Sequence, residues 1–271
     1  MNWPDGARLA VWLSFDFDAE SSWLSRDPKN AKKPGTLSHG VFGAKVGIFS
    51  VLEVLQRQGI QGTFFVPGWV AEKYRDTVKT IQDEGHEIGH HGYLHEWIDP
   101  DEPEKEREVF HQGLNALVNV TGKQPVGYRS PAAETSANMM DLLIEHDFLY
   151  SSNMMDDIRP YFVEKNGKKT ALVELPFHWM LVDTPFFRYS IQSPSPISPA
   201  SQACAVWKEE FHALYQKGGI FTLICHPQYI GRPSRIAMLN DFICFMKTYP
   251  DVWFANGETI ARYVRHEYPL T

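Results

Sequence analysis

The stretch that decides the fold reads Leu9-Ala10-Val11-Trp12-Leu13-Ser14-Phe15-Asp16-Phe17-Asp18. A short continuous apolar run such as 9–15 predicts a strand that is buried on both faces, as in a parallel sheet. The strand is expected to end at Asp16, and Asp18 follows two residues later. A buried strand that leads directly into acidic side chains indicates an α/β fold with polar chemistry at one edge of its sheet.

Outward from this strand, strand-like apolar runs alternate with amphipathic helical stretches along the whole chain. This alternation predicts a largely parallel sheet with right-handed crossovers. About seven strands favour a (β/α) barrel over a short open sheet, with a doubly wound sheet as the alternative. Strands are expected at 9–16, 62–66, 87–89, 126–129, 148–150, 172–175, 220–225 and 252–254, and helices at 48–58, 77–84, 104–120, 136–146, 207–217, 235–247 and 258–266.

The composition describes a single globular domain over residues 1–271. Hydrophobic residues make up 43% of the chain, which is enough for a sizeable core. The net charge of −7 argues against a surface that neutralises phosphates, so nucleic acid is not expected as a partner. No apolar run approaches the roughly 18 residues of a membrane span, so no membrane partner is expected either.

Two further features predict a cytoplasmic protein. Residues 1–6 lack the basic and apolar regions of a secretory signal. The three cysteines, Cys204, Cys225 and Cys244, lack CxxC spacing and are expected to be reduced thiols. The alternation of strands and helices is broken at Ser25 to Phe42 and at Gln192 to Ala200, which are predicted to be long loops.

Polar side chains that can bind metal or carry protons gather just after the predicted strands. Parallel α/β folds build their functional sites at this end of the sheet. The residues concerned are Asp16, Asp18, His90, His91, His95, Arg129 and His226.

His91 and His95 are four residues apart, a spacing that returns both imidazoles to the same side of a helix or of an extended stretch. Two imidazoles and one carboxylate make a set of three ligands that leaves positions open for water and substrate, as a catalytic zinc requires. The alternative is that one or both histidines are capping or core groups.

Asp16 and Asp18 lie on the same side of an extended chain, so one can bind a metal while the other accepts a proton from water. The alternative is a solvated acidic turn. His226 can donate a proton to a leaving group or stabilise an oxyanion, and otherwise it is a hydrogen-bonded core histidine.

Several other residues are weaker candidates. Trp179 and Asp183 are candidates for a substrate wall, His39 for a substrate contact, and His86 and His90 for groups that orient the metal ligands. Core packing is the alternative for the aromatic residue, and a plain surface loop for His39.

Four motifs together resemble those of the polysaccharide deacetylase family, also called the NodB-homology domain or carbohydrate esterase family four. They are Ser14-Phe15-Asp16-Phe17-Asp18, His91-Gly92-Tyr93-Leu94-His95, Arg129-Ser130-Pro131 and Leu223-Ile224-Cys225-His226. The resemblance runs in order from about residue 8 to residue 260 and implies a distorted (β/α) barrel of about seven strands.

The resemblance also implies roles for individual residues. Asp16 would be the general base, Arg129 would orient it, and His226 would be the general acid. The metal ligands would be Asp18, His91 and His95. The segment from Tyr128 to Pro131 would line the substrate groove. The carboxylate that supports His226 would be Asp157 or Asp183, both also candidates for substrate contacts.

Local sequence is similar to an intracellular branch of the family. In extracellular sugar deacetylases the first motif usually holds two adjacent aspartates, whereas here Phe17 separates them. The branch contains a Helicobacter-type peptidoglycan deacetylase homologue, cyclic imide hydrolases and metal-independent allantoinases, and its members are often tetramers. The resemblance therefore implies a homo-oligomer.

The function expected from these observations is metal-dependent hydrolysis of a carbon–nitrogen bond other than a peptide bond. The metal is expected to be Zn²⁺, with Co²⁺, Mn²⁺, Ni²⁺ and Fe²⁺ as alternatives. The substrate is either an N-acetylated sugar that releases acetate or a small cyclic imide or ureide whose ring is opened. A barrel that binds a sugar without catalysis is the alternative from another class.

Overall fold

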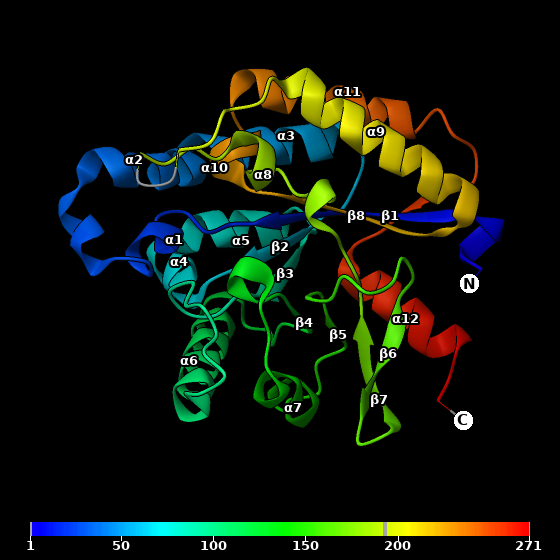
Figure 1. The fold of residues 1–271 in the computed structure, drawn as a ribbon, viewed down its shortest axis with the longest axis horizontal. Coiled ribbons are helices and arrows are strands. Elements are labelled where there is room, and N and C mark those ends of the chain that lie inside the picture. Colours follow the sequence, from blue (N-terminus) through cyan, green and yellow to red (C-terminus); the bar gives the residue numbers. More distant parts are fainter. Residues whose placement is uncertain (1, 192–193, 271) are drawn as a thin grey trace.

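A curled, mostly parallel sheet organises the structure, a computed structural model that describes residues 2–191 and 194–270 (Figure 1). Along the sheet the order is β7-β5-β4-β3-β2-β1-β8, and every neighbouring pair in this order is parallel. At one edge β6 pairs with β7 in antiparallel fashion, and β9 adds to β1. The strands are β1 Leu9–Asp16, β2 Thr63–Val66, β3 Glu87–His90, β4 Gly127–Tyr128, β5 Tyr150–Ser151, β6 Tyr161–Lys165, β7 Lys168–Glu174, β8 Gly219–Cys225 and β9 Val252–Phe254.

Chain segments, rather than a strand ladder, bridge the gap between β8 and β7. Asp183 N–H donates to Ile224 O at 3.0 Å, and Ile220 N–H donates to Ile158 O at 2.9 Å. The Thr222 hydroxyl donates to Pro176 O at 2.8 Å. The sheet therefore curls into a barrel that is closed irregularly on this side, and the predicted distorted (β/α) barrel is confirmed.

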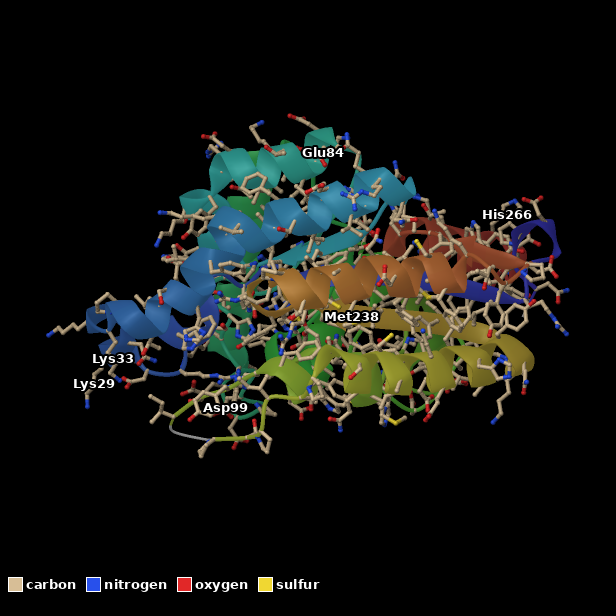
Figure 2. The ribbon with its side chains drawn as sticks, turned by 90° about the horizontal axis from the view of Figure 1, so that it is seen from above. Lys29, Lys33, Glu84, Asp99, Met238 and His266 are labelled. Atoms are coloured by element: carbon tan, nitrogen blue, oxygen red, sulfur yellow. The ribbon has the colours of Figure 1, made fainter. Side chains whose placement is uncertain are left out.

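Helices cover the outside of the sheet. Figure 1 shows α3, α9 and α11 along β1 and β8, and Figure 2 shows the same three helices side by side from above, with Met238 on α11. The helices are α1 Ser21–Leu24, α2 Pro34–Phe42, α3 Ile48–Gln58, α4 Gly68–Lys73, α5 Arg75–Asp83, α6 Pro103–Thr121, α7 Ala137–Glu145, α8 Thr184–Phe187, α9 Ala200–Lys217, α10 Pro227–Ile230, α11 Pro233–Met246 and α12 Gly257–Glu267.

The strongest sequence patterns correspond to the observed elements. All residues of β1 and β8 are buried, as their continuous apolar runs predict. The α3 helix ends at Gly59, which has a left-handed φ of 62°. The elements that the patterns did not indicate include α4 and β6. Both are short, and β6 is a partly exposed edge strand, so neither carries a clear apolar period.

The predicted loop over Ser25 to Phe42 is wrong, because most of this stretch is helical. A 3₁₀ turn spans Pro28–Lys32, and α2 follows over Pro34–Phe42. Both prolines occupy the first helical position, where the missing N–H has no helical partner to lose. A Cβ atom on Gly40 would collide with Ala19 O, so this glycine serves close packing rather than a turn. The second predicted loop is found over 194–199, while Gln192 and Ser193 lie outside the described residues.

The helical run from Pro34 to Gln58 is 25 residues long and is apolar enough, by length and composition, to cross a membrane. The prediction that no stretch approaches a membrane span was therefore too strong. A core helix of a soluble protein meets the same criterion, and here Ile48, Val51 and Leu55 are fully buried in the largest hydrophobic cluster. On this packing we interpret the α3 part of the run as a core helix.

Candidate active site

A cavity of about 290 Å³ opens at the carboxyl ends of the strands. Its lining includes two groups of residues that differ in burial. The floor consists of the buried or nearly buried polar residues Asp16, Asp18, His91, His95, Arg129 and His226. The mouth consists of the half-buried or exposed residues Trp23, Arg26, Trp97, Trp179 and Arg188.

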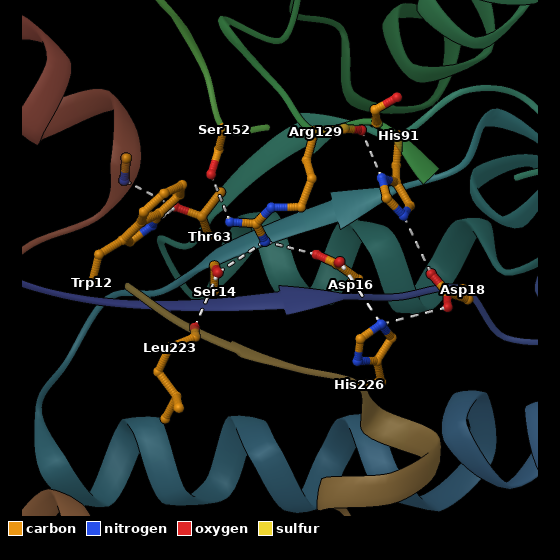
Figure 3. A network of polar contacts seen from close by, with 12 residues as sticks. Trp12, Ser14, Asp16, Asp18, Thr63, His91, Arg129, Ser152, Leu223 and His226 are labelled. Atoms are coloured by element: carbon orange, nitrogen blue, oxygen red, sulfur yellow. Dashed lines mark hydrogen bonds and ion pairs between the residues drawn. The ribbon is translucent and has the colours of Figure 1, made fainter. Parts of the chain in front are cut away.

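Three potential metal ligands meet at the floor. The ligand atoms of Asp18, His91 and His95 all lie within 4.8 Å of one another. Asp18 Oδ1 is 3.5 Å from His91 Nε2, and Asp18 Oδ2 is 3.6 Å from His95 Nε2 (Figure 3 shows the first of these contacts). Sequence spacing alone suggested a helix or an extended stretch for the two histidines. Instead they lie on the turn after β3, where Gly92 and His95 have left-handed φ angles of 72° and 65°.

The bonding state of these atoms fits a divalent cation. Asp18 Oδ1 and His91 Nε2 are buried, and neither has a hydrogen-bond partner among the described residues. Burial alone would raise the pKa of the Asp18 carboxyl, but the nearby imidazoles of His95, His91 and His226 hold that pKa well below its usual range. An ionised carboxylate and two imidazoles are the donor set of a catalytic zinc site.

Backbone carbonyls set the orientation of the two adjacent histidines. His91 Nδ1 lies 2.7 Å from Arg129 O and donates to it, which leaves Nε2 as the free ring nitrogen (Figure 3). His90 Nε2 donates to Phe110 O at 2.9 Å, and its Nδ1 accepts from Gly92 N–H at 3.1 Å. Burial lowers the pKa of His90 to about 4. His90 therefore holds the turn that carries the metal ligands.

His86 does not reach the site, contrary to the prediction. It precedes β3, so a strand's length separates it from the ligands at the other end. Its Nδ1 accepts from Gly62 N–H at 3.2 Å, and burial lowers its pKa to about 4.

Asp16 and Arg129 form a buried ion pair. Arg129 Nη1 donates to Asp16 Oδ1 at 2.8 Å and to Ser14 Oγ at 2.9 Å, while Nη2 donates to Ser152 Oγ at 3.1 Å (Figure 3). The guanidinium also lies 4.3 Å from the centre of the Phe65 ring. These contacts leave Asp16 Oδ2 facing His226 Nε2, 3.8 Å away.

Asp183 is the carboxylate that supports His226. Its Oδ1 accepts from His226 Nδ1 at 2.7 Å, and its Oδ2 accepts from the His226 backbone N–H at 2.8 Å. Burial by itself lowers the pKa of the His226 imidazole, but the carboxylates of Asp183, Asp18 and Asp16 raise that pKa to about 9. His226 therefore holds a proton at neutral pH, with Nε2 directed at the floor.

Of the three other residues predicted to contact substrate near this site, one lines the cavity and two do not. Trp179 lines the cavity. Asp183 is fully buried behind His226, so it does not contact substrate. The Asp157 carboxylate is exposed and accepts from the backbone N–H groups of Ile158 and Arg159; it does not line this cavity, and the partner of His226 is Asp183 instead.

Three further predicted contacts also lie away from this cavity. The Tyr128 ring is buried against His90 and Phe110, on the side of β4 opposite to the floor. Pro131 is buried beside a second, smaller cavity with Tyr128. His39 is exposed on α2 and its ring neighbours Trp23, 6.0 Å away between ring centres. Side-chain direction, which motif order does not carry, separates these residues from the site.

Sequence reasoning missed several residues of the site. Gln228 Nε2 donates to Asp18 Oδ2 at 3.3 Å, and its place two residues after His226 was a usable signal. Ser152, Arg26 and Arg188 carried no signal, because they come from segments without a motif.

Comparison with known proteins decides the family. The polysaccharide deacetylase family model matches residues 43–151. A crystal structure of a Mycobacterium smegmatis protein that carries the family's name superposes with a TM-score of 0.95. It shares 38% identity over 100% of this chain and 96% of its own. The chain belongs to the polysaccharide deacetylase family. It is therefore a hydrolase of carbon–nitrogen bonds other than peptide bonds, in a family whose deacetylases depend on a metal.

Two other relatives of this deacetylase-family protein bear on its chemistry. A peptidoglycan deacetylase of Helicobacter pylori is 29% identical over 93% of this chain and 95% of its own length. The structure of a Puue allantoinase superposes with a TM-score of 0.84 and is 25% identical, covering 99% of this chain and 94% of its own. The resemblance drawn from the four motifs is confirmed. Proteins named as deacetylases and a protein named as an allantoinase are both similar to this chain.

Proposed function

We propose that this protein is a metal-dependent hydrolase that opens a small cyclic amide, of the imide or ureide class. The observation that carries the proposal is the convergence of Asp18, His91 and His95 on the floor of one cavity, with Asp16 and His226 beside them. The three potential metal ligands favour metal-dependent chemistry. Asp16 as a base and His226 as an acid, on either side of the same site, favour hydrolysis.

The shape of the cavity supports a small substrate. Its volume of about 290 Å³ is at the lower end of the range for small-molecule sites. Trp23, Trp97 and Trp179 contribute to its lining, and their rings suit a planar ring.

Protons are moved by the residues of this chain. A divalent cation, when bound by Asp18, His91 and His95, would polarise the substrate carbonyl and lower the pKa of water toward about 7. Asp16, held by Arg129, accepts a proton from the attacking water. His226 donates the proton on Nε2 to the departing nitrogen, while Asp183 holds its Nδ1–H.

Deacetylation of an N-acetylated sugar is the second candidate. The names of the Helicobacter pylori relative and of the Mycobacterium smegmatis structure favour it. The same acid and base would serve, with acetate as the product. Both candidates place an amide carbonyl at the floor, and they differ in what extends into the mouth.

Zinc content and turnover of the purified protein distinguish the candidates. The protein is assayed on succinimide and on an N-acetylglucosamine oligosaccharide, with and without added Zn²⁺. Stoichiometric zinc with turnover of the imide alone is the expected result. Turnover of the sugar alone would reject imide opening in favour of deacetylation. A protein with neither metal nor turnover would be a binding barrel.

We further infer that the protein works in the cytoplasm as a homotetramer. A small diffusible substrate is consistent with that compartment, and the resemblance to the intracellular branch supports the assembly. Cell fractionation and light scattering of the purified protein measure the two properties directly.

A further inference from the structure

Two arginines line the active-site cavity without a role in the proposed proton transfers. Arg26 follows α1, and Arg188 follows α8. In the part of the chain that the structure describes, neither guanidinium takes part in an ion pair or a hydrogen bond. Arg188 is half-buried, so its charge is partly shielded from water and yet has no carboxylate partner. An unpaired, half-buried guanidinium in a cavity is available to bind an anion.

The acidic residues of the cavity are already engaged elsewhere. Among the described lining residues they are Asp16 and Asp18, and both lie at the floor. Asp16 is paired with Arg129, and Asp18 belongs to the metal-ligand set. The arginines of the mouth therefore have no acid of this cavity to neutralise them, although the chain as a whole carries a net charge of −7.

The mouth is also arranged to present these charges. The Arg26 guanidinium lies over the Trp97 ring, 5.3 Å from its centre. Stacking on an aromatic face fixes the plane of a guanidinium and leaves its N–H groups free to donate in that plane. Planar N–H pairs match a carboxylate, which accepts two parallel hydrogen bonds.

We propose that Arg188, assisted by Arg26, binds a carboxylate group of the substrate, so that the enzyme selects anionic amides over neutral ones. The inference rests on the proposed function, because it takes the hydrolysed amide to lie at the floor. A substrate that places its carbonyl there extends its far end into the mouth. A carboxylate at that end meets the two guanidinium groups.

A carboxylate of this kind has two sources that the same arginines would recognise. It is carried by a substituted cyclic imide or by the lactyl group of an N-acetylated muramic acid. Two matched pairs of compounds test both sources. One pair is carboxymethylsuccinimide and succinimide, and the other is N-acetylmuramic acid and N-acetylglucosamine.

The experiment measures binding and turnover of all four compounds by the zinc-loaded enzyme at neutral pH. The variants are Arg188→Gln, Arg26→Gln and, as a matched control, Arg57→Gln, whose arginine pairs with Glu53 on the exposed face of α3. We expect wild type to prefer the anionic member of at least one pair by about tenfold or more. Arg188→Gln should remove most of that preference, Arg26→Gln a smaller part, and Arg57→Gln none.

Each outcome decides the proposal. Equal binding of both members of each pair by wild type would overturn it, and so would a preference that survives in Arg188→Gln. Binding preference for the anion without turnover of any compound would support the arginine assignment and reject the proposed function. Turnover without any preference for the anion would support the proposed function and reject the arginine assignment.

Discussion

The floor and the mouth of the active-site cavity are built in different ways. At the floor the side chains are buried or nearly buried, and several are held by another group, as Arg129 holds Asp16 and Asp183 holds His226. At the mouth Trp97 and Trp179 are 59% and 41% exposed, and the Arg188 guanidinium has no hydrogen bond or ion pair among the described residues. A fixed floor suits one reaction, whereas an open mouth with free charges suits the choice of substrate.

The largest expected effect is at the floor, on removal of a metal ligand. His91→Ala leaves Asp18 and His95 as the remaining donors, which is too few for a stable catalytic site. We expect zinc occupancy and turnover both to fall to background, as measured by metal analysis and an amide hydrolysis assay. The matched control is His86→Ala at the far end of β3, which should keep its zinc. Full zinc occupancy in His91→Ala would remove this histidine from the ligand set.

Asp16→Asn is expected to separate metal binding from catalysis. The side chain keeps its size and a contact with Arg129, but it no longer accepts a proton from water. Loss of a general base lowers kcat by about 10²–10⁴-fold. Zinc content should stay at the wild-type level. A variant with near wild-type kcat would show that another group takes the proton.

Asp183→Asn should change the pH dependence more than the maximal rate. In wild type the carboxylates around His226 raise its pKa to about 9, so the proton needed for the leaving group is lost only as pH rises through about 9. Without the Asp183 charge the alkaline decline of kcat/KM should move toward the ordinary histidine pKa near 6.5.

The same linkage acts on folding stability. The pKa of His226 is higher in the folded protein than in the unfolded chain, so the protonated imidazole stabilises the fold. This stabilisation is fully present below about pH 6.5 and is lost as pH rises through about 9. Urea unfolding of wild type and Asp183→Asn at pH 6 and pH 9.5 measures this.

An alkaline limb of the rate profile that does not move in the variant would contradict the assignment of His226 as the acid.

The smallest expected effect is at the mouth. Trp179 is partly exposed and contacts Phe177 edge-on, so its loss removes stacking area but no charged group. Trp179→Ala should raise KM about fivefold, equivalent to about 1 kcal/mol, with little change in kcat. Trp253→Ala, at a site away from the cavity, is the matched control. A large fall in kcat with constant KM would move Trp179 from binding to chemistry and would weaken the distinction between mouth and floor.

Sequence patterns predicted the floor because its residues lie at the end of a strand or within a few residues after one. Asp16 ends β1 and His226 follows β8, and the burial of these strands was visible in their apolar runs. The turn at His95, by contrast, leaves no periodic signal in the sequence. The spacing of the two histidines therefore correctly predicted that they lie together, but it predicted a helix or an extended stretch where the structure has a turn. His86 shows the same limit, since four residues of β3 separate it from His91.

The arginines of the mouth were invisible to the sequence, because they come from segments without a motif that are brought together only by packing. Arg26 and Arg188 are 162 positions apart in the chain, by subtraction of their numbers, yet they line one cavity. The helical stretch before α3 was also missed, because prolines and glycines that serve helix starts and close contacts resemble a loop.

By itself the sequence determined the alternating α/β architecture, the family, and the residues that could carry chemistry, because burial periodicity and residue type are local properties of a chain. Only the tertiary structure decided that Asp183 supports His226 and that two arginines stand free at the mouth. Those facts depend on the direction of side chains and on distances across the barrel, which are set by the packing of segments remote in sequence.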